Sequence, residues 1–250
     1  MREQVNPDFQ RRREAGGEIL VAADAANAYE PAWFDGAGQG DRAEHVSGGR
    51  GSVRVFDTPI GPLVGRVYLR GGLPRYLIRD RYFWTGALQT RSFHEFRILR
   101  SLHARGLRVP EAIAARYQRS GLGYRAALLM RLIPGARTLA EAITAGMDVG
   151  EVFPRVAAAI ADLHRAKVWH ADLNAMNILL DADGVVWLID FDRAQSGVED
   201  GARLAANLDR LMRSLRKVLA PAPMAIVDAC WPEFLRAYQA RLGGVSSTTA

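Results

Sequence analysis

The most constraining feature of this sequence is the run of residues 152–192, in which signals for a helix, a polar loop and a β-hairpin follow one another. Apolar residues from Val152 to Leu163 recur at spacings of four, four and three, which predicts an amphipathic helix. Residues 178–180 and 185–189 are apolar, and the Asp-Ala-Asp-Gly segment between them predicts a hairpin turn. The polar residues before the hairpin are therefore expected to form a loop held between a helix and a hairpin.

This loop and the end of the hairpin carry side chains suited to phosphoryl transfer. His170, Asp172 and Asn177 form the pattern H-x-D-x-x-x-x-N of a kinase catalytic loop, and Asp190 follows the second hairpin strand. A carboxylate at Asp172 can orient an attacking hydroxyl and accept its proton. Asn177 and Asp190 supply the oxygen ligands that Mg²⁺ prefers, and His170 is expected to support the loop backbone.

One residue departs from the protein-kinase pattern, because Asp192 stands where the Asp-Phe-Gly motif has glycine. This difference counts against a flipping Phe191 and leaves metal binding by Asp190 unaffected. The alternative is a surface loop that carries Asp and Asn by chance, and it requires both halves of the pattern to coincide.

Candidates for nucleotide binding lie in strand-like segments earlier in the chain. A strand is predicted at 52–56, and the backbone N–H groups of Gly49 and Gly51 just before it can cover phosphates. A plain turn is an alternative, and the glycine-rich residues 36–40 compete for the same role.

A cation for the phosphates is expected on the next strand. No lysine occurs before Lys167, so Arg66 is the candidate, with an exposed strand arginine as the alternative. Its expected partner is Glu95, in a helix predicted at 92–105. Ser92 and Glu95 also have the spacing of a capping box, which would engage the glutamate at the start of its own helix.

Met130 ends a strand-like segment where the strand-rich and helical parts of the chain would join. Its backbone is a candidate for pairing with adenine, and a buried strand end is the alternative. Candidates for contacts with the phosphate acceptor are Tyr82, Trp84, Thr85 and Arg91.

The predicted order of elements is strands, helix, strands, helix, hairpin and helix, which fits the α+β class. Strands are also expected at 18–21, 63–68, 109–117 and 124–133, and a third helix at 204–219. The expected domains are an N-terminal extension joining the N-lobe at 1–47, a nucleotide-binding N-lobe at 48–133, a catalytic C-lobe at 134–242 and a loose tail at 243–250.

Arginine dominates the basic residues, since lysine occurs only at Lys167 and Lys217 and the net charge is +6. A GC-rich genome accounts for this bias, and guanidinium groups also bind phosphate bidentately. Arg210, Arg213, Arg216 and Lys217 recur every three to four residues, which predicts a basic face on the third helix, with an ordinary solvated face as the alternative.

Features that the sequence lacks limit the expected partners and the expected cellular compartment. No nucleic-acid module is recognisable and the arginines are spread along the chain, so no nucleic-acid partner is expected. The single cysteine, Cys230, forms no internal disulfide and suits a reducing cytosol. No apolar run approaches the roughly 18 residues that span a bilayer.

Taken together, these residues resemble the bacterial Kdo kinases, which phosphorylate 3-deoxy-D-manno-octulosonic acid (Kdo) in the inner core of lipopolysaccharide. The likeness covers roughly residues 48–217 and rests on the segments 70–73, 90–97, 133–139, 169–174, 189–193, 207–211 and 213–217. The pattern H-x-D-x-x-x-x-N alone is shared with aminoglycoside, choline and heptose kinases. Met176 departs from the polar or histidine residue expected at its position.

The resemblance implies a protein-kinase-like bilobal fold of the α+β class, with a small β-rich N-lobe and a mainly helical C-lobe. It implies ATP and Mg²⁺ as cofactors and transfer to the 4-hydroxyl of Kdo on a lipid A precursor, a lipid-linked acidic sugar. It also implies peripheral attachment to an anionic membrane surface, at the cytoplasmic face of the bacterial inner membrane.

Two other functions stay open. One is a kinase for another small molecule, of the heptose or aminoglycoside type. The other is a catalytically silent kinase fold that binds a partner, which the missing strand lysine favours and the presence of Asp172, Asn177 and Asp190 opposes.

Overall fold

The computed structural model describes residues 7–35, 41–42, 52–68 and 82–244. The chain forms two compact units, Met1–Ser101 with Pro110–Leu132 and Leu102–Val109 with Ile133–Ala250. The first unit is built on an antiparallel sheet and the second is mainly helical, which confirms the α+β class.

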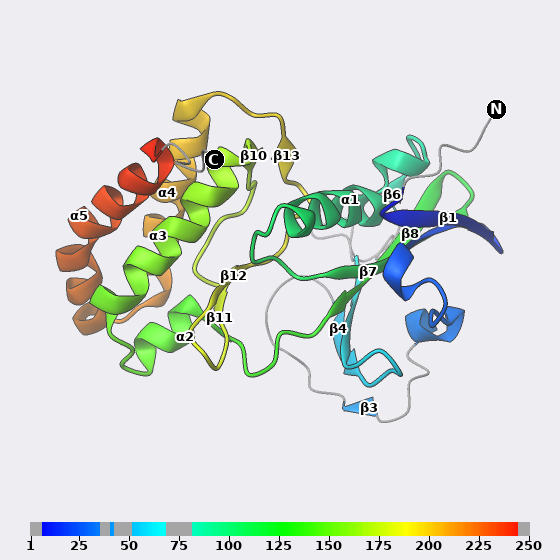
Figure 1. Cartoon of the computed structure of the whole chain (residues 1–250), viewed down its shortest axis with the longest axis horizontal. Coiled ribbons are helices and arrows are strands. Elements are labelled where there is room, and N and C mark those ends of the chain that lie inside the picture. The colour runs from blue at the N-terminus through cyan, green and yellow to red at the C-terminus, as the bar shows by residue number, and fades with distance from the viewer. Residues whose placement is uncertain (1–6, 36–40, 43–51, 69–81, 245–250) are drawn as a thin grey trace, which may run out of the picture. The chain divides into compact units, whose positions relative to one another are not determined.

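An eight-stranded sheet forms the centre of the first unit (Figure 1). Its strands are β1 (Phe9–Glu14), β2 (Gly17–Ala22), β3 (Asp41–Arg42), β4 (Ser52–Phe56), β5 (Leu63–Val67), β6 (Tyr82–Phe83), β7 (Ala112–Ser120) and β8 (Gly123–Arg131). They lie in the order β1-β2-β7-β8-β5-β4-β3, and β6 pairs with β8. The N-terminal hairpin β1–β2 therefore extends the sheet beyond β7.

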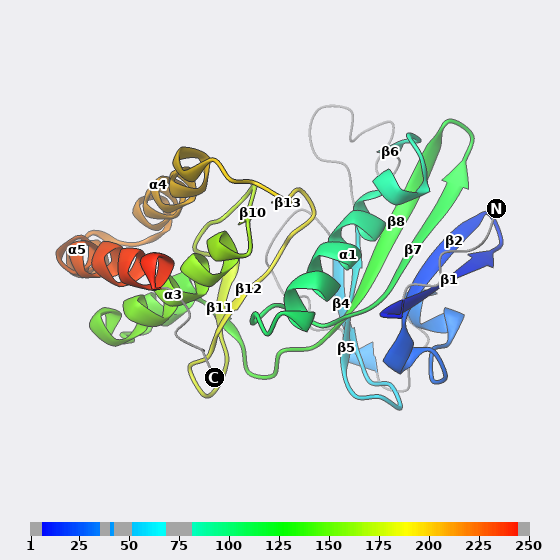
Figure 2. The ribbon, with the colours of Figure 1, turned by 45° about the horizontal axis from the view of Figure 1, so that its top comes forward.

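Helix α1 (Arg91–Ala104) packs on this sheet, and Figure 2 shows it beside β7 and β8. The predicted face of Phe96, Leu99 and Leu102 is buried. The ring of Phe93 meets Tyr117 of β7 at 5.1 Å between centroids. These contacts fix the orientation of α1, and with it the direction of Glu95.

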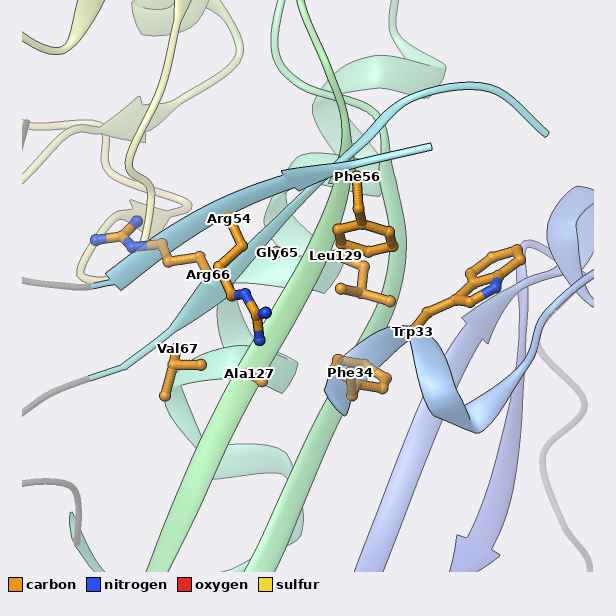
Figure 3. A pocket seen from close by; sticks show the side chains of 9 residues that line it. All are labelled: Trp33, Phe34, Arg54, Phe56, Gly65, Arg66, Val67, Ala127 and Leu129. Carbon is orange, nitrogen blue, oxygen red and sulfur yellow. The ribbon is translucent and has the colours of Figure 1, made fainter. Parts of the chain in front are cut away.

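A short 3-10 segment, η2 (Pro31–Asp35), packs on the same sheet. Figure 3 shows Trp33 and Phe34 beside Phe56 and Leu129, around a small hollow. Trp33 and Phe56 are both almost fully buried. The hollow therefore lies between the N-terminal residues and the sheet, and Arg54 and Arg66 also line it.

The second unit contains four helices and three short strand pairings among the described residues (Figure 1). The helices are α2 (Leu139–Thr144), α3 (Val149–Arg165), α4 (Gly201–Val218) and α5 (Pro221–Gly243). The strands are β9 (Arg137–Thr138), β10 (Val168–Trp169), β11 (Ile178–Leu180), β12 (Val186–Leu188) and β13 (Gln195–Ser196). The predicted amphipathic helix and hairpin are thus present as α3 and β11–β12.

Helices α3 and α5 pack along each other in the same direction. Phe153 meets Phe234 with ring centroids 5.3 Å apart, and further along Asp162 Oδ1 accepts from Arg241 Nε at 2.8 Å. Helix α4 lies between them in the sequence. Among the helices of the described residues, none has both the length and the apolarity that crossing a bilayer requires.

Candidate active site

Pairing of the β11–β12 hairpin places Asn177 beside Asp190. Ile178 lies opposite Leu188 in the antiparallel register. One step further out, the N–H of Ile189 donates to the carbonyl of Asn177 at 3.0 Å. Because Asp190 directly follows Ile189, the amide and the carboxylate are held at the same open end of the hairpin.

His170 joins the candidate catalytic loop, residues 169–177, to this end of the hairpin. Its Nε2 lies 2.9 Å from the carbonyl oxygen of Ile189, and its Nδ1 lies 3.2 Å from the backbone nitrogen of Asp172. Burial lowers the pKa of His170. The ring is therefore neutral, with Nε2–H donating to Ile189 and Nδ1 accepting from Asp172.

A third link completes the arrangement, since Nδ2 of Asn177 donates to the carbonyl of Asp172 at 2.8 Å. Hydrogen bonds thus link Asp172 to Asn177 and Asn177 to Ile189, the residue that directly precedes Asp190. The carboxylate of Asp172 faces solvent, with 61% of the side chain exposed. This leaves it open to a hydroxyl of a bound acceptor.

Asp190 has an unusual backbone conformation, with φ at +68°. Asp tolerates this left-handed region better than most residues, yet it costs of order 1 kcal/mol and is typical of functional sites. Its Oδ1 is buried. The following Phe191 is fully buried, and its ring meets that of His170 at 4.8 Å. Phe191 therefore anchors the segment that carries Asp190.

Helix α4 supports the loop through Asn207, whose position sequence reasoning did not assign to the site. Its Nδ2 donates to the carbonyl of His170 at 2.7 Å, and its Oδ1 accepts from the His170 backbone N–H at 3.3 Å. The sequence gives two signals for it: the likeness of residues 207–211 to the Kdo kinases, and an asparagine in the apolar stripe of a helix, where a buried amide requires partners.

A buried histidine on α3 extends this support. Nε2 of His164 lies 3.2 Å from Oδ1 of Asn207, and its Nδ1 lies 2.8 Å from the hydroxyl of Tyr238 on α5. Because the amide oxygen only accepts, Nε2 carries the proton and Nδ1 accepts from Tyr238. Burial lowers the pKa of His164 from 6.5 to about 4. Three helices thus meet behind the loop through neutral hydrogen bonds.

We expect this histidine to make stability depend on pH. In the unfolded chain His164 binds a proton below pH 6.5, whereas in the folded chain it stays neutral down to about pH 4. Its contribution to the free energy of unfolding is therefore complete above pH 6.5 and is lost as the pH falls. The loss between pH 7.5 and 5 is about 2 kcal/mol. Urea unfolding at both pH values should show this loss in the native chain and less of it in His164→Gln. Equal pH dependence in the two proteins would contradict the assignment.

In the first unit the structure contains the predicted Arg66–Glu95 ion pair, with Nη1 and Oε1 3.5 Å apart. The carboxylate of Glu95 is almost fully buried and also accepts from the hydroxyl of Tyr68. Burial raises the pKa of Tyr68, so the phenol stays protonated and donates.

The capping-box alternative for Glu95 is wrong. Ser92 is the second residue of α1 and not the residue that precedes it, and its hydroxyl donates to the carbonyl of Arg116 at 3.0 Å. The carboxylate of Glu95 is directed toward Arg66. Helix α1 begins at Arg91, and Glu95 does not cap its N-terminus.

The other residues predicted to bind the nucleotide are Gly49, Gly51 and Met130. Gly49 and Gly51 lie outside the described residues. Met130 lies inside β8, opposite Val64 of β5 on one side and Ala112 of β7 on the other. Its backbone therefore belongs to the sheet, and pairing with adenine stays a prediction.

The candidate acceptor residues of the first unit are packed against one another or their neighbours. Nη1 of Arg91 donates to the hydroxyl of Tyr82 at 2.6 Å. The ring of Trp84 lies 4.9 Å from that of Tyr117, and Thr85 is exposed. These contacts add no support for binding of an acceptor.

The donor set of Asn177 and Asp190 fits Mg²⁺, which would neutralise the charge of a nucleotide's phosphates. Among the described residues, no group of three or more His, Cys, Asp or Glu side chains is placed to hold a metal. Mg²⁺ that binds substrate phosphates needs only one or two carboxylates. Asp190 could supply one. Nδ2 of Asn177 donates to the carbonyl of Asp172, so its amide oxygen would be available as a second ligand.

A sheet unit with an Arg–Glu pair and a helical unit with this loop and hairpin define the protein-kinase-like class. Residues 38–238 match the lipopolysaccharide kinase (Kdo/WaaP) family, and the chain belongs to that family. It is therefore an ATP-dependent kinase.

Curated relatives of this chain carry the name 3-deoxy-D-manno-octulosonic acid kinase. The protein of Xanthomonas axonopodis pv. citri (strain 306) is 45% identical over 229 residues, 91% of each chain. That of Stenotrophomonas maltophilia (strain K279a) is 44% identical over 224 residues, 89% of each chain. A solved structure titled "Crystal structure of monomeric WbdD" is similar with a TM-score of 0.46 and 18% identity, and the match covers 77% of this chain and 45% of that one.

Proposed function

We propose that this kinase transfers the terminal phosphate of ATP to a hydroxyl of Kdo in lipopolysaccharide biosynthesis. The observation that supports the proposal is the set of hydrogen bonds that joins Asp172, Asn177 and Ile189, the residue directly before Asp190. The choice of Kdo as the acceptor is supported by the name of the curated relatives, which match this chain over about nine-tenths of its length. The finer proposal is transfer to the 4-hydroxyl of Kdo on a lipid A precursor.

In this reaction the sugar hydroxyl attacks the terminal phosphorus, a new O–P bond forms, and the bond to the leaving ADP breaks. Asp172 orients the hydroxyl and accepts its proton, and its exposed carboxylate allows this. Asn177 and Asp190 would hold Mg²⁺, which neutralises phosphate charge when it is bound. His170 keeps the loop at the hairpin so that these groups remain in position.

The direct test combines purified protein, ATP, Mg²⁺ and a Kdo-lipid A precursor, followed by mass measurement of the lipid. A gain of one phosphate on the Kdo residue supports the proposal, and tandem fragmentation locates the hydroxyl. A parallel panel of heptose and aminoglycoside acceptors addresses the alternative of another small-molecule kinase. Phosphorylation of one of these acceptors without phosphorylation of Kdo would overturn the assignment.

Arg66 is the proposed ligand of the ATP phosphates. We expect Arg66→Ala to lower kcat/KM for ATP by roughly 10- to 100-fold, because a charge-assisted hydrogen bond is worth about 1.5–3 kcal/mol. Arg66→Lys should retain much of the activity, since it keeps a cation beside the buried Glu95. Steady-state kinetics at varied ATP concentration measure both variants. An unchanged kcat/KM in Arg66→Ala would remove this residue from the site.

We also propose peripheral attachment at the cytoplasmic face of the inner membrane, through the basic face of α4. Leu208, Leu211, Leu215 and Leu219 are buried as predicted. Arg213, Arg216 and Lys217 are exposed, although Arg216 also pairs with Asp228 of α5 at 3.2 Å.

We expect the protein to float with anionic vesicles at low salt and to be released at high salt. The double variant Arg213→Gln/Lys217→Gln should bind about 30-fold more weakly, because each basic residue near an anionic surface contributes about 1 kcal/mol. Uncharged vesicles provide the control. Protein that stays in solution with anionic vesicles at low salt would contradict the proposal.

A further inference from the structure

One face of α4 lies along the candidate catalytic loop, residue by residue. Four helix positions at spacings of four, three and four contact four loop positions in the same order. The pairs are Arg203 with Trp169, Asn207 with His170, Arg210 with Asp172 and Ser214 with Ala175. Such spacings place the four helix residues on a single face.

Three of these contacts fix the helix against the loop. The guanidinium of Arg203 lies 4.2 Å from the ring centre of Trp169. Asn207 makes two hydrogen bonds with the backbone of His170, and the hydroxyl of Ser214 accepts from the N–H of Ala175 at 3.1 Å. Arg210 stands between Asn207 and Ser214, so its backbone is held firmly next to Asp172.

The contact between Arg210 and Asp172 is weaker than the other three contacts between α4 and the loop. Nη1 of Arg210 lies 3.7 Å from Oδ1 of Asp172, a single long contact between side chains that are 43% and 61% exposed. Exposed ion pairs of this kind add little to stability. Throughout the described ranges, Asp172 is the partner with which Arg210 forms an ion pair. A guanidinium carries five N–H donors, so most of them remain for a ligand.

We infer that Arg210 binds the carboxylate of the acidic acceptor sugar, and this inference rests on the proposed function. The acceptor is an octulosonic acid, so one sugar carries both the carboxylate and the hydroxyl to be phosphorylated. A guanidinium fork matches a carboxylate in bidentate geometry. When the acceptor binds, its carboxylate replaces Asp172 as the partner of Arg210, and Asp172 turns to the hydroxyl.

The other basic residues of α4 do not share this position. Arg216 is directed to Asp228 of α5, and Arg203 stacks on Trp169 and donates to Gln195 at 2.8 Å. Arg213 is exposed and lies three residues beyond Arg210 along the helix. In the described part of the chain, Arg210 is therefore the cation of α4 that meets the side chain proposed as the base.

The test compares two acceptors, Kdo and its methyl ester, which differ in the charge of one group. We expect Arg210→Gln to raise KM for the acid about 10- to 100-fold and to leave KM for the ester and for ATP unchanged. Arg210→Lys should recover part of the preference for the acid. Arg236→Gln, which removes an exposed arginine from α5, serves as the charge-matched control and should behave as the native enzyme does.

The outcomes separate binding of the acceptor from positioning of the base. An equal fall of kcat on acid and ester would mean that Arg210 acts through Asp172, and it would overturn the inference. Unchanged kinetics on both acceptors would overturn it as well.

Calorimetry of Kdo binding to native protein and to Arg210→Gln separates this inference from the proposed function. If the native protein transfers no phosphate to the Kdo of a lipid A precursor, the proposed function fails. Weaker binding of Kdo to the variant still supports the inference, and equal binding, or no binding by the native protein, overturns it.

Discussion

Asp190→Asn should reduce phosphotransfer by roughly 10³-fold while the chain remains folded, because a metal ligand at a transferring phosphate contributes several kcal/mol to transition-state stabilisation. The substitution removes one charge and keeps the shape of the side chain. Asparagine also tolerates the left-handed backbone at this position, where φ is +68°. We therefore expect the midpoint of thermal unfolding to stay close to that of the native protein.

A second measurement tests the metal role of Asp190 apart from turnover. The affinity for ATP, measured by calorimetry with and without Mg²⁺, should rise with Mg²⁺ in the native protein and respond much less in the variant. Asp183→Asn is the matched control, because Asp183 is an exposed carboxylate at the turn of the same hairpin. A variant that kept activity within tenfold and the full response to Mg²⁺ would place the metal elsewhere.

Asp172→Asn should lower kcat by about 10²- to 10⁴-fold, the range typical of a lost general base. KM for ATP should change little, because the side chain is proposed to meet the acceptor hydroxyl. Stability should also be nearly unchanged, since the loop is held through the backbone of Asp172 and the ion pair with Arg210 is exposed. Steady-state kinetics and thermal unfolding together measure these expectations.

Asp209→Asn provides the matched control for this base. Asp209 is an exposed carboxylate on α4, next in sequence to Arg210, and the described structure gives it no role in the loop. Native activity is expected for this variant. If Asp172→Asn kept the native kcat, the proton would have to go to another group, and the mechanism proposed above would be wrong.

The part of the site that could be predicted from the sequence is the part set by local pairing. A hairpin with a two-fold side-chain alternation places the residue before its first strand beside the residues after its second, so Asn177 and Asp190 had to meet. The pattern H-x-D-x-x-x-x-N then adds Asp172 through a loop of a few residues. Short-range geometry of this kind leaves few alternatives.

The supporting network could not be predicted, because it depends on how distant helices pack. His164, Asn207 and Tyr238 lie on three helices, and nothing in their local sequence indicates that their side chains meet. The sequence predicts Arg210 only as part of a basic face of the third helix, because its contact with Asp172 depends on the same packing.

Several elements of the fold are not predicted by the sequence, and α5 and β1 show two different physical reasons for this. Helix α5 contains Pro221, Pro223 and Pro232, which interrupted the apolar pattern; two of them lie in its first turn, where the missing N–H costs nothing. Strand β1 carries Arg11 among other polar residues and shows no alternation, because it is the outer strand of the sheet.

The position of β2 also decides where a self-sufficient piece of this protein can start. The family match begins at residue 38, yet β2 pairs with one side of β7 from Ala114 to Gln118, and Trp33 is buried against apolar side chains of the sheet. A shortened chain that kept only the matched residues would present a bare β7 edge to water and to other chains, which is the arrangement that invites aggregation. We therefore expect the smallest independently folding part of this kinase to begin before residue 38, where the family match starts.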